Sequence, residues 1–237
     1  MTFEPSATPE QIQARQTAFN GLPDPATLVS REEIRAALLD RHTAATQDKL
    51  DAARVAICGC GGLGSTIAVA LTRIGVGHLH LIDFDRVDMT NLNRQQYFLK
   101  DLGQYKTEAL RSNLRQINPF IDITVDTVKV TDENVPTLLD NEDIICEAFD
   151  VPENKTMLVN AVLENLPGKK LVSASGMAGF RSSNLVSTRR VSKNFYFCGD
   201  GETAPVPGAG LMAPRVGVVA CHEANMITRL ILGEEDA

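Results

Sequence analysis

The chain has no tryptophan and only 5% aromatic residues, and none of its apolar runs approaches the roughly 18 residues that a membrane-spanning helix needs. Its first ten residues, MTFEPSATPE, have neither the positive segment nor the apolar segment of a secretory signal. We therefore expect a cytoplasmic protein that does not partner with a membrane.

Positive charge is also scarce. Lys and Arg number 23 against 30 Asp and Glu, which gives a net charge of −7. A protein whose main task is to bind nucleic acid or an anionic surface needs a positive face. The charge balance therefore argues against nucleic acid as the partner.

Cysteines are few, and they are not spaced as in a secreted protein. The chain has five, at positions 58, 60, 146, 198 and 221. An odd number at these spacings does not resemble a disulfide framework.

From Arg54 onward, short apolar segments alternate with segments of helical spacing. This alternation is typical of a parallel sheet that helices cover on both faces. The predicted strands are residues 54–58, 78–83, 121–126, 143–149 and 170–175, and the predicted helices are residues 63–74, 106–117, 131–140 and 154–165. The sequence thus predicts an α/β fold with a doubly wound, Rossmann-like and mainly parallel sheet.

Other patterns precede this alternation. Residues 1–29 contain four prolines and no sustained periodicity, so we predict an N-terminal arm. Ser30 and Glu33 form a capping-box pattern that opens a short amphipathic helix ending near Arg41. We expect residues 30–237 to form a single domain.

The alternation breaks after Gly176. Residues 183–197 have room for one or two additional strands, and residues 198–210 are a loop rich in Gly and Pro. A C-terminal helix is predicted to start near Pro214 and to stop at Gly233.

The first predicted strand is followed by the glycine-rich loop CGCGGLGS. Glycines 59, 61 and 64 satisfy G-x-G-x-x-G, Gly62 stands among them, and Asp83 follows at the end of the next strand. Absent side chains let the backbone approach a phosphate at a helix N-terminus, and the carboxylate accepts hydrogen bonds from ribose hydroxyls. The pattern suits NAD, FAD, S-adenosylmethionine or ATP.

Polar residues after Asp83 favour ATP. Asn91, Arg94 and Gln95 are followed by Lys106 at the start of a helix. A triphosphate carries about four negative charges, which cationic groups must neutralise when pyrophosphate leaves. A hydride-transfer enzyme has no evident use for this set.

A third feature is Asp150, at the end of the apolar segment 143–149. Ligands of open parallel sheets bind beyond the carboxyl ends of the strands. A carboxylate at that position suits Mg²⁺, which prefers one or two carboxylates together with phosphate oxygens.

Together, the segments GCGGLGS, DFDRVDMTNLNRQ, EAFD and GLMAPRVGVVA, with Lys106, resemble the ThiF/MoeB family of ubiquitin-activating-type adenylyltransferases. The resemblance spans about Ser30 to Gly233 and is greatest to the short ThiF members, which act on the sulfur carrier ThiS in thiamine biosynthesis. It implies attack of the carrier's C-terminal Gly-Gly carboxylate on the α-phosphorus of ATP, giving an acyl-adenylate and pyrophosphate.

The resemblance also implies roles for single residues. Asp83 would bind the ribose, Asn91, Arg94 and Lys106 the phosphates, and Asp150 the magnesium. Arg41 matches an arginine that the family sends into the neighbouring subunit's active site, so a homodimer is expected.

The sequence departs from the family in its cysteines. Many members hold a structural zinc with two C-x-x-C pairs, and this chain has none, so we predict no zinc. Packing of the segment NFYF, residues 194–197, is then expected to fix the region after Gly176. Some relatives use a loop cysteine in a covalent step with the carrier, which makes Cys198 a possible reactive thiol, although no activating base stands beside it.

Other functions remain open at this stage. The carrier could be of the molybdopterin type, or the substrate could be a modified tRNA base, as for threonylcarbamoyladenosine dehydratase. An NAD-dependent oxidoreductase is the alternative from a different class.

Overall fold

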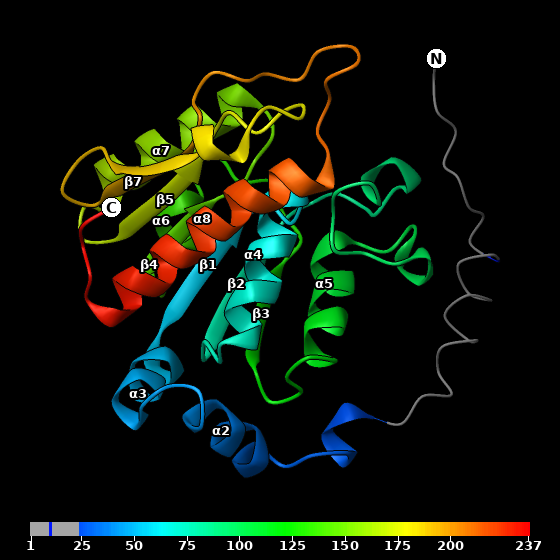
Figure 1. Ribbon diagram of the computed structural model, residues 1–237, viewed down its shortest axis with the longest axis vertical. Helices are drawn as coiled ribbons and strands as arrows, with labels where there is room; N and C mark the ends of the chain where they lie inside the picture. The colour runs from blue at the N-terminus through cyan, green and yellow to red at the C-terminus, as the bar shows by residue number, and fades with distance from the viewer. Residues whose placement is uncertain (1–9, 11–23) are drawn as a thin grey trace.

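A seven-stranded sheet forms the centre of the molecule in the computed structural model, which describes Glu10 and residues 24–237 (Figure 1). The strand order is β3-β2-β1-β4-β5-β7-β6. Every neighbouring pair is parallel except β6 with β7. The strands are β1 (Arg54–Cys58), β2 (His78–Ile82), β3 (Asp122–Asp126), β4 (Ile144–Glu147), β5 (Lys170–Ala174), β6 (Ser187–Arg190) and β7 (Phe195–Gly199).

Helices cover both faces of this sheet. Helices α4, α5 and α8 pack on one face, and α6 and α7 pack behind β4 and β5 on the other (Figure 1). The α-helices of the described residues are α2 (Arg31–Leu39), α3 (Ala44–Ala52), α4 (Gly62–Arg73), α5 (Lys106–Arg115), α6 (Val135–Leu138), α7 (Pro152–Asn165) and α8 (Ala213–Leu232). The predicted doubly wound, Rossmann-like fold is confirmed.

The hydrophobic core has two parts, one on each face of the sheet. Successive side chains of a strand point to opposite faces. Val55 and Ile57 of β1 therefore belong to the larger core under α4 and α8, whereas Ala56 and Cys58 face α6 and α7. This two-sided burial explains why the strands are apolar at nearly every position.

The prediction of one helix from Ser30 to the region of Arg41 was only partly right. Ser30 forms the expected capping box with Glu33, but α2 ends at Leu39, and a second helix, α3, was not predicted. Thr43 caps α3 by accepting a hydrogen bond from the Thr46 N–H. Only two residues of α3 are buried, so its sequence has little helical periodicity.

The predicted helix over residues 131–140 was also too long. Only Val135–Leu138 are α-helical. The Asn134 side chain accepts from the Thr131 N–H and donates to the Lys129 carbonyl. These local bonds replace the first turn of a longer helix.

The C-terminal part follows the prediction. Residues 187–199 form the antiparallel pair β6 and β7, and α8 ends where Gly233 adopts φ 95°. A positive φ is accessible to glycine at little cost, so this residue closes the helix.

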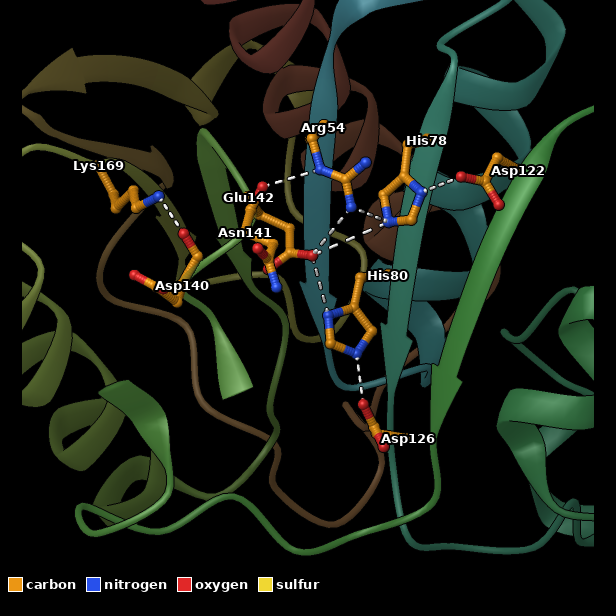
Figure 2. Close-up of polar contacts among 9 residues, drawn as sticks. All are labelled: Arg54, His78, His80, Asp122, Asp126, Asp140, Asn141, Glu142 and Lys169. Carbon is orange, nitrogen blue, oxygen red and sulfur yellow. Dashed lines mark hydrogen bonds and ion pairs between the residues drawn. The ribbon is translucent and has the colours of Figure 1, made fainter. Parts of the chain in front are cut away.

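A polar cluster lies on β2, on the face that α6 and α7 leave uncovered. His78 and His80 point to this face, and the buried Glu142, just before β4, lies between them (Figure 2). Its Oε1 atom is 3.2 Å from His80 Nδ1 and 3.8 Å from His78 Nε2. Asp122 and Asp126 of β3 bind the outer nitrogens of the two rings at 2.7 and 2.8 Å. Polar groups thus complete this face of the sheet, beside the part that α6 and α7 cover.

No helix in the described part of the chain is both long and apolar enough to span a bilayer. Most of the predicted N-terminal arm lies outside the described residues, which include only Glu10 and 24–29 of it.

Candidate active site

A cavity of about 470 Å³ opens at the carboxyl ends of β1, β2 and β4. Strand order reverses between β1 and β4, and such a switch point is where open α/β sheets bind ligands. Of the residues selected from the sequence, Gly59, Gly61, Gly62, Asp83, Arg94, Gln95, Lys106 and Asp150 line this cavity. The fold thus brings together segments that are up to 90 residues apart.

Two glycines of the loop stand where the neighbouring backbone leaves no room for a Cβ atom. Gly59 has φ 100°, and a Cβ atom there would lie 2.7 Å from the Ala148 carbonyl oxygen. Gly64 does not line the cavity, but a Cβ atom there would lie 1.8 Å from the Gly59 carbonyl oxygen. Gly61 is the N-cap of α4 and offers no side chain to cap it. The first N–H groups of α4 are therefore open to an anion.

Asp83 is tied to the glycine loop. One of its carboxylate oxygens accepts from the Cys60 N–H at 2.7 Å, and the other accepts from the Asp85 N–H at 2.8 Å. An ionised carboxylate has further lone pairs, so these bonds leave it able to accept from a ribose hydroxyl. Asp83 therefore shapes the loop and also faces the cavity.

Two predicted phosphate ligands line the cavity as cations. The Lys106 ammonium lies 2.7 Å from Asp85 Oδ2, and its side chain is 8% exposed. Arg94 donates to Asn93 Oδ1 at 2.9 Å and to the Thr90 carbonyl oxygen at 3.3 Å. These neighbours fix the directions of both cations.

Asn91 does not line the cavity, in contrast to the expectation that it binds phosphate. Its side-chain oxygen accepts from the Asp88 N–H and closes the short helix Met89–Asn91. Gln95 does line the cavity, and its buried Oε1 has no hydrogen-bond partner among the described residues. In this arrangement Asn91 shapes the loop that presents Arg94 and Gln95.

Asp150 is exposed at the cavity, and no hydrogen bond or ion pair engages its side chain within the described residues. The alternative that it caps the next helix is not realised, because Val151 is the N-cap of α7 and no side chain caps this helix. An unpartnered carboxylate facing cationic groups fits Mg²⁺ held together with phosphates.

Sequence reasoning missed two further cations that line the cavity, Lys129, which is exposed, and Lys155. Lys155 lies in the first turns of α7 and lines the cavity, with its ammonium 3.0 Å from the buried Glu147 carboxylate and 2.9 Å from the Ala174 carbonyl oxygen. Glu147 also accepts from the Ser173 hydroxyl and the Phe149 N–H. The signal for Lys155 in the sequence was its place just after Asp150, in the segment that leaves the carboxyl end of β4.

Residues 34–237 match the ThiF family. The chain belongs to the ThiF family. The relatives described below are named adenylyltransferases, an enzyme class that agrees with the fold and with the cavity.

The chain is similar to two relatives of different overall length. It is 32% identical over 184 residues to the molybdopterin-synthase adenylyltransferase of Haemophilus influenzae. That match covers 75% of this chain and 74% of that protein. It is 29% identical over 202 residues to the adenylyltransferase and sulfurtransferase MOCS3 of Culex quinquefasciatus, covering 80% of this chain and 44% of that protein. The chain therefore spans less than half the length of this second type of relative.

A solved structure supports the fold. The Escherichia coli tRNA N6-threonylcarbamoyladenosine dehydratase TcdA, in complex with ATP, superposes with a TM-score of 0.75 at 22% identity. The match covers 84% of this chain and 93% of that one.

Arg41 lies far from the cavity of its own chain. It stands in the turn between α2 and α3, and α3 packs at the amino ends of β1 and β2, where the Leu50 and Ala53 carbonyls accept from Gly77 and His78 (Figure 1). The cavity opens at the opposite end of these strands. Arg41 therefore does not line the cavity of its own chain.

Cys198 is not in a loop, in contrast to the sequence-based expectation. It lies on β7, is 0% exposed, and its thiol contacts Thr188 Oγ1 at 3.5 Å. Burial, reinforced by nearby Glu223, raises the pKa of Cys198 to about 12. The thiolate form that covalent chemistry needs is therefore strongly disfavoured in this conformation.

Two features fix the region after Gly176. The NFYF segment contributes Tyr196, which is fully buried on β7. A buried ion pair between Asp200 and Arg215 also holds the region.

Among Glu10 and residues 24–237, no group of three or more His, Cys, Asp or Glu side chains could hold a metal ion.

Proposed function

We propose that this chain catalyses the ATP-dependent adenylylation of the C-terminal Gly-Gly carboxylate of a ThiS-like β-grasp sulfur carrier protein. The single observation that carries the proposal is one cavity that combines the glycine loop, Asp83, four cationic side chains and the unpartnered Asp150. Hydride transfer to NAD has no need for this cationic set, because no triphosphate charge has to be neutralised.

The reaction requires positioning and charge neutralisation, and no side-chain nucleophile. A carboxylate oxygen of the carrier attacks the α-phosphorus of ATP, the new oxygen–phosphorus bond forms, and the bond to the bridging oxygen of pyrophosphate breaks. Pyrophosphate departs with the bonding electron pair, and no proton needs to move.

The chain's own groups would divide this work. The glycine-loop N–H groups and Asp83 hold the nucleotide, while Arg94, Lys106 and Lys155 neutralise charge that moves to the leaving group. Asp150 would hold Mg²⁺, which when bound supplies further positive charge at the phosphates.

Two substrates compete with ThiS. A molybdopterin-type carrier is favoured by the Haemophilus influenzae relative, which covers 75% of this chain. A tRNA base is suggested by the TcdA neighbour, but the net charge of −7 disfavours a nucleic acid partner.

A homodimer with shared sites is part of the proposal. It rests on the place of Arg41 at the end of the sheet opposite the cavity, together with the family resemblance. In a symmetric dimer, each Arg41 would enter the partner's cavity and add a further cation.

ATP–pyrophosphate exchange with a panel of purified carriers tests the function. Asp150→Ala and Arg94→Ala should each lower the exchange rate roughly 100-fold or more. Glu164→Ala and Arg73→Ala remove exposed charges of the same kinds away from the cavity and should leave the rate unchanged. Undiminished exchange in both site variants would refute the site, and exchange only with a molybdopterin-type carrier would refute ThiS specificity.

Mixed dimers test the shared site. Subunits with Arg41→Ala and subunits with Asp150→Ala are each expected to be inactive alone. A mixed dimer restores one intact site if Arg41 acts across the interface. Proven mixed dimers without activity would exclude that role.

A further inference from the structure

Two connecting segments form the wall of the cavity opposite the glycine loop. They are residues 175–178, which follow β5, and residues 201–205, which follow β7. Neither segment belongs to a helix or strand. In Figure 1 the connection from β7 to α8 passes above the carboxyl ends of the strands. Contacts other than the sheet ladder must therefore hold this wall in place.

Asp200 holds the second segment. Its carboxylate accepts hydrogen bonds from the N–H groups of Glu202 and Thr203, both at 2.9 Å, and from the Thr203 hydroxyl. These bonds fold residues 200–203 around one carboxylate. Glu202 and Thr203 themselves line the cavity.

Arg215, in the first turn of α8, joins this carboxylate to a third segment. One guanidinium nitrogen donates to Asp200 at 2.5 Å. Another donates to the carbonyl oxygens of Arg181 and Ser182, at 2.7 and 2.8 Å. A single side chain thus ties α8 to the segments that follow both β5 and β7.

The two wall segments also touch through their backbones. The Asp200 and Gly201 N–H groups donate to the carbonyls of Gly176 and Ser175, both at 3.2 Å. Gly176 has φ 81°, and a Cβ atom there would lie 2.0 Å from Asp200 Oδ1. The carboxylate therefore fits a space that only a glycine leaves open.

The pair is buried, since the side chains of Asp200 and Arg215 are each 4% exposed. A buried ion pair is weak evidence for stability, because the cost of desolvating both charges offsets their attraction. The hydrogen-bond partners of this pair are Glu202 and Thr203 of the wall and the carbonyls of Arg181 and Ser182, which follow the wall segment 175–178. The sheet does not require the pair, because the β5–β7 pairing ends at Cys198.

We propose that Asp200 and Arg215 act as positioning residues that hold the wall against which the carrier's Gly-Gly tail is aligned with ATP. This inference rests on the proposed function. Apart from its terminal carboxylate, a Gly-Gly tail presents only backbone amide groups, so a wall of backbone and mostly uncharged side chains suits it. The wall includes Met177, Ala178 and Ala204 and has Glu202 as its one charged side chain, whereas Arg94, Lys106 and Lys155 come from other segments.

The test compares Asp200→Asn and Arg215→Lys with the parent and with Leu50→Ala. The first removes a charge at constant shape, and the second keeps the charge but loses the forked geometry. Leu50 is a buried residue of α3 at the other end of the sheet, so its truncation lowers stability without touching the wall. Calorimetry gives the Kd for ATP, pyrophosphate exchange gives the KM for the carrier, and hydrogen exchange reports on residues 200–206.

We expect the two wall variants to raise the KM for the carrier roughly tenfold or more while the Kd for ATP stays within about twofold. Amide exchange in residues 200–206 should accelerate in them and remain unchanged in Leu50→Ala. An unchanged carrier KM, or an equal loss of ATP and carrier binding, would overturn the inference. Absence of exchange in the parent with every carrier would instead remove the proposed function.

Discussion

The Lys155 ammonium lies 3.0 Å from the carboxylate of Glu147, a residue with no exposed surface at the end of β4. This pair directs a positive charge into the cavity from the strand next to the switch point. Because Glu147 is buried, removal of Lys155 leaves an uncompensated charge, which costs roughly 3–5 kcal/mol of stability. The pair therefore links the stability of the fold to the chemistry of the site.

Two variants separate these two effects. Lys155→Met should lower both the unfolding free energy and the rate of pyrophosphate exchange, the latter roughly 100-fold. The double variant Glu147→Gln/Lys155→Met should regain stability but not activity, because it removes the buried charge without restoring the cation. Recovery of activity in the double variant would show that Lys155 only balances Glu147.

The histidine cluster on β2 predicts a pH-dependent stability. Burial alone lowers the pKa of His80, but the carboxylates of Glu142 and Asp126 outweigh it and raise the pKa above 6.5. His78, Asp122 and Arg54 also lie in this cluster (Figure 2).

A raised folded-state pKa means that this stabilisation is fully present below about pH 6.5 and is lost as pH rises through the folded value. Urea unfolding measured from about pH 5.5 to about pH 9 should show this decline in the free energy of unfolding. His80→Gln should flatten it, whereas His42→Gln, outside the sheet, should keep the slope. A parent profile that is equally flat would contradict the assignment.

Glu223 on α8 predicts the effect of a neutral replacement. It is completely buried, and burial raises its pKa well above the usual range, although the Lys155 charge opposes the shift. Because the folded-state pKa is raised, stability is highest below about pH 4.5 and declines as pH rises toward the folded value. Glu223→Gln should therefore stabilise the protein, and more so at pH 8 than at pH 5. Equal gains at both values, measured by thermal unfolding, would argue against a protonated carboxyl.

The cysteines predict a simple reactivity pattern. Cys58, Cys60, Cys146 and Cys198 are buried, and Cys221 on α8 is exposed. One thiol of the native protein should therefore react quickly with iodoacetamide, and Cys221→Ser should abolish this phase.

Cys198→Ala should keep the parent's rate of pyrophosphate exchange. Rapid labelling of Cys198 in the presence of carrier would show that β7 opens during the reaction.

Local signals made much of the fold predictable. The capping box at Ser30, the glycine loop and the apolar strands gave the correct element types, because each depends on neighbours within a few residues. Helix α3 was missed because it buries only Gln47 and Leu50, and α6 was overextended because Asn134 satisfies the preceding backbone groups itself. Both errors arise where weak periodicity leaves the result to side-chain contacts.

The candidate site was predictable where a motif combines residue type with position along a strand. Gly59, Asp83, Arg94, Lys106 and Asp150 all reach the cavity because they stand in the connections that leave the carboxyl ends of parallel strands, Lys106 at the start of α5. Spacing along the chain does not report how a side chain is hydrogen-bonded. The sequence therefore did not predict that Asn91 lies outside the cavity or that Lys155 lies inside it.

Residue order alone was enough to indicate the sheet, its helical cover and the nucleotide loop, since these follow from periodicity and from backbone geometry that only glycine permits. The burial of Cys198, the Asp200–Arg215 pair across two connections and the position of Arg41 opposite the cavity depended on the assembled molecule. These are contacts between segments far apart in the chain, and their distances and desolvation exist only once the sheet has been assembled.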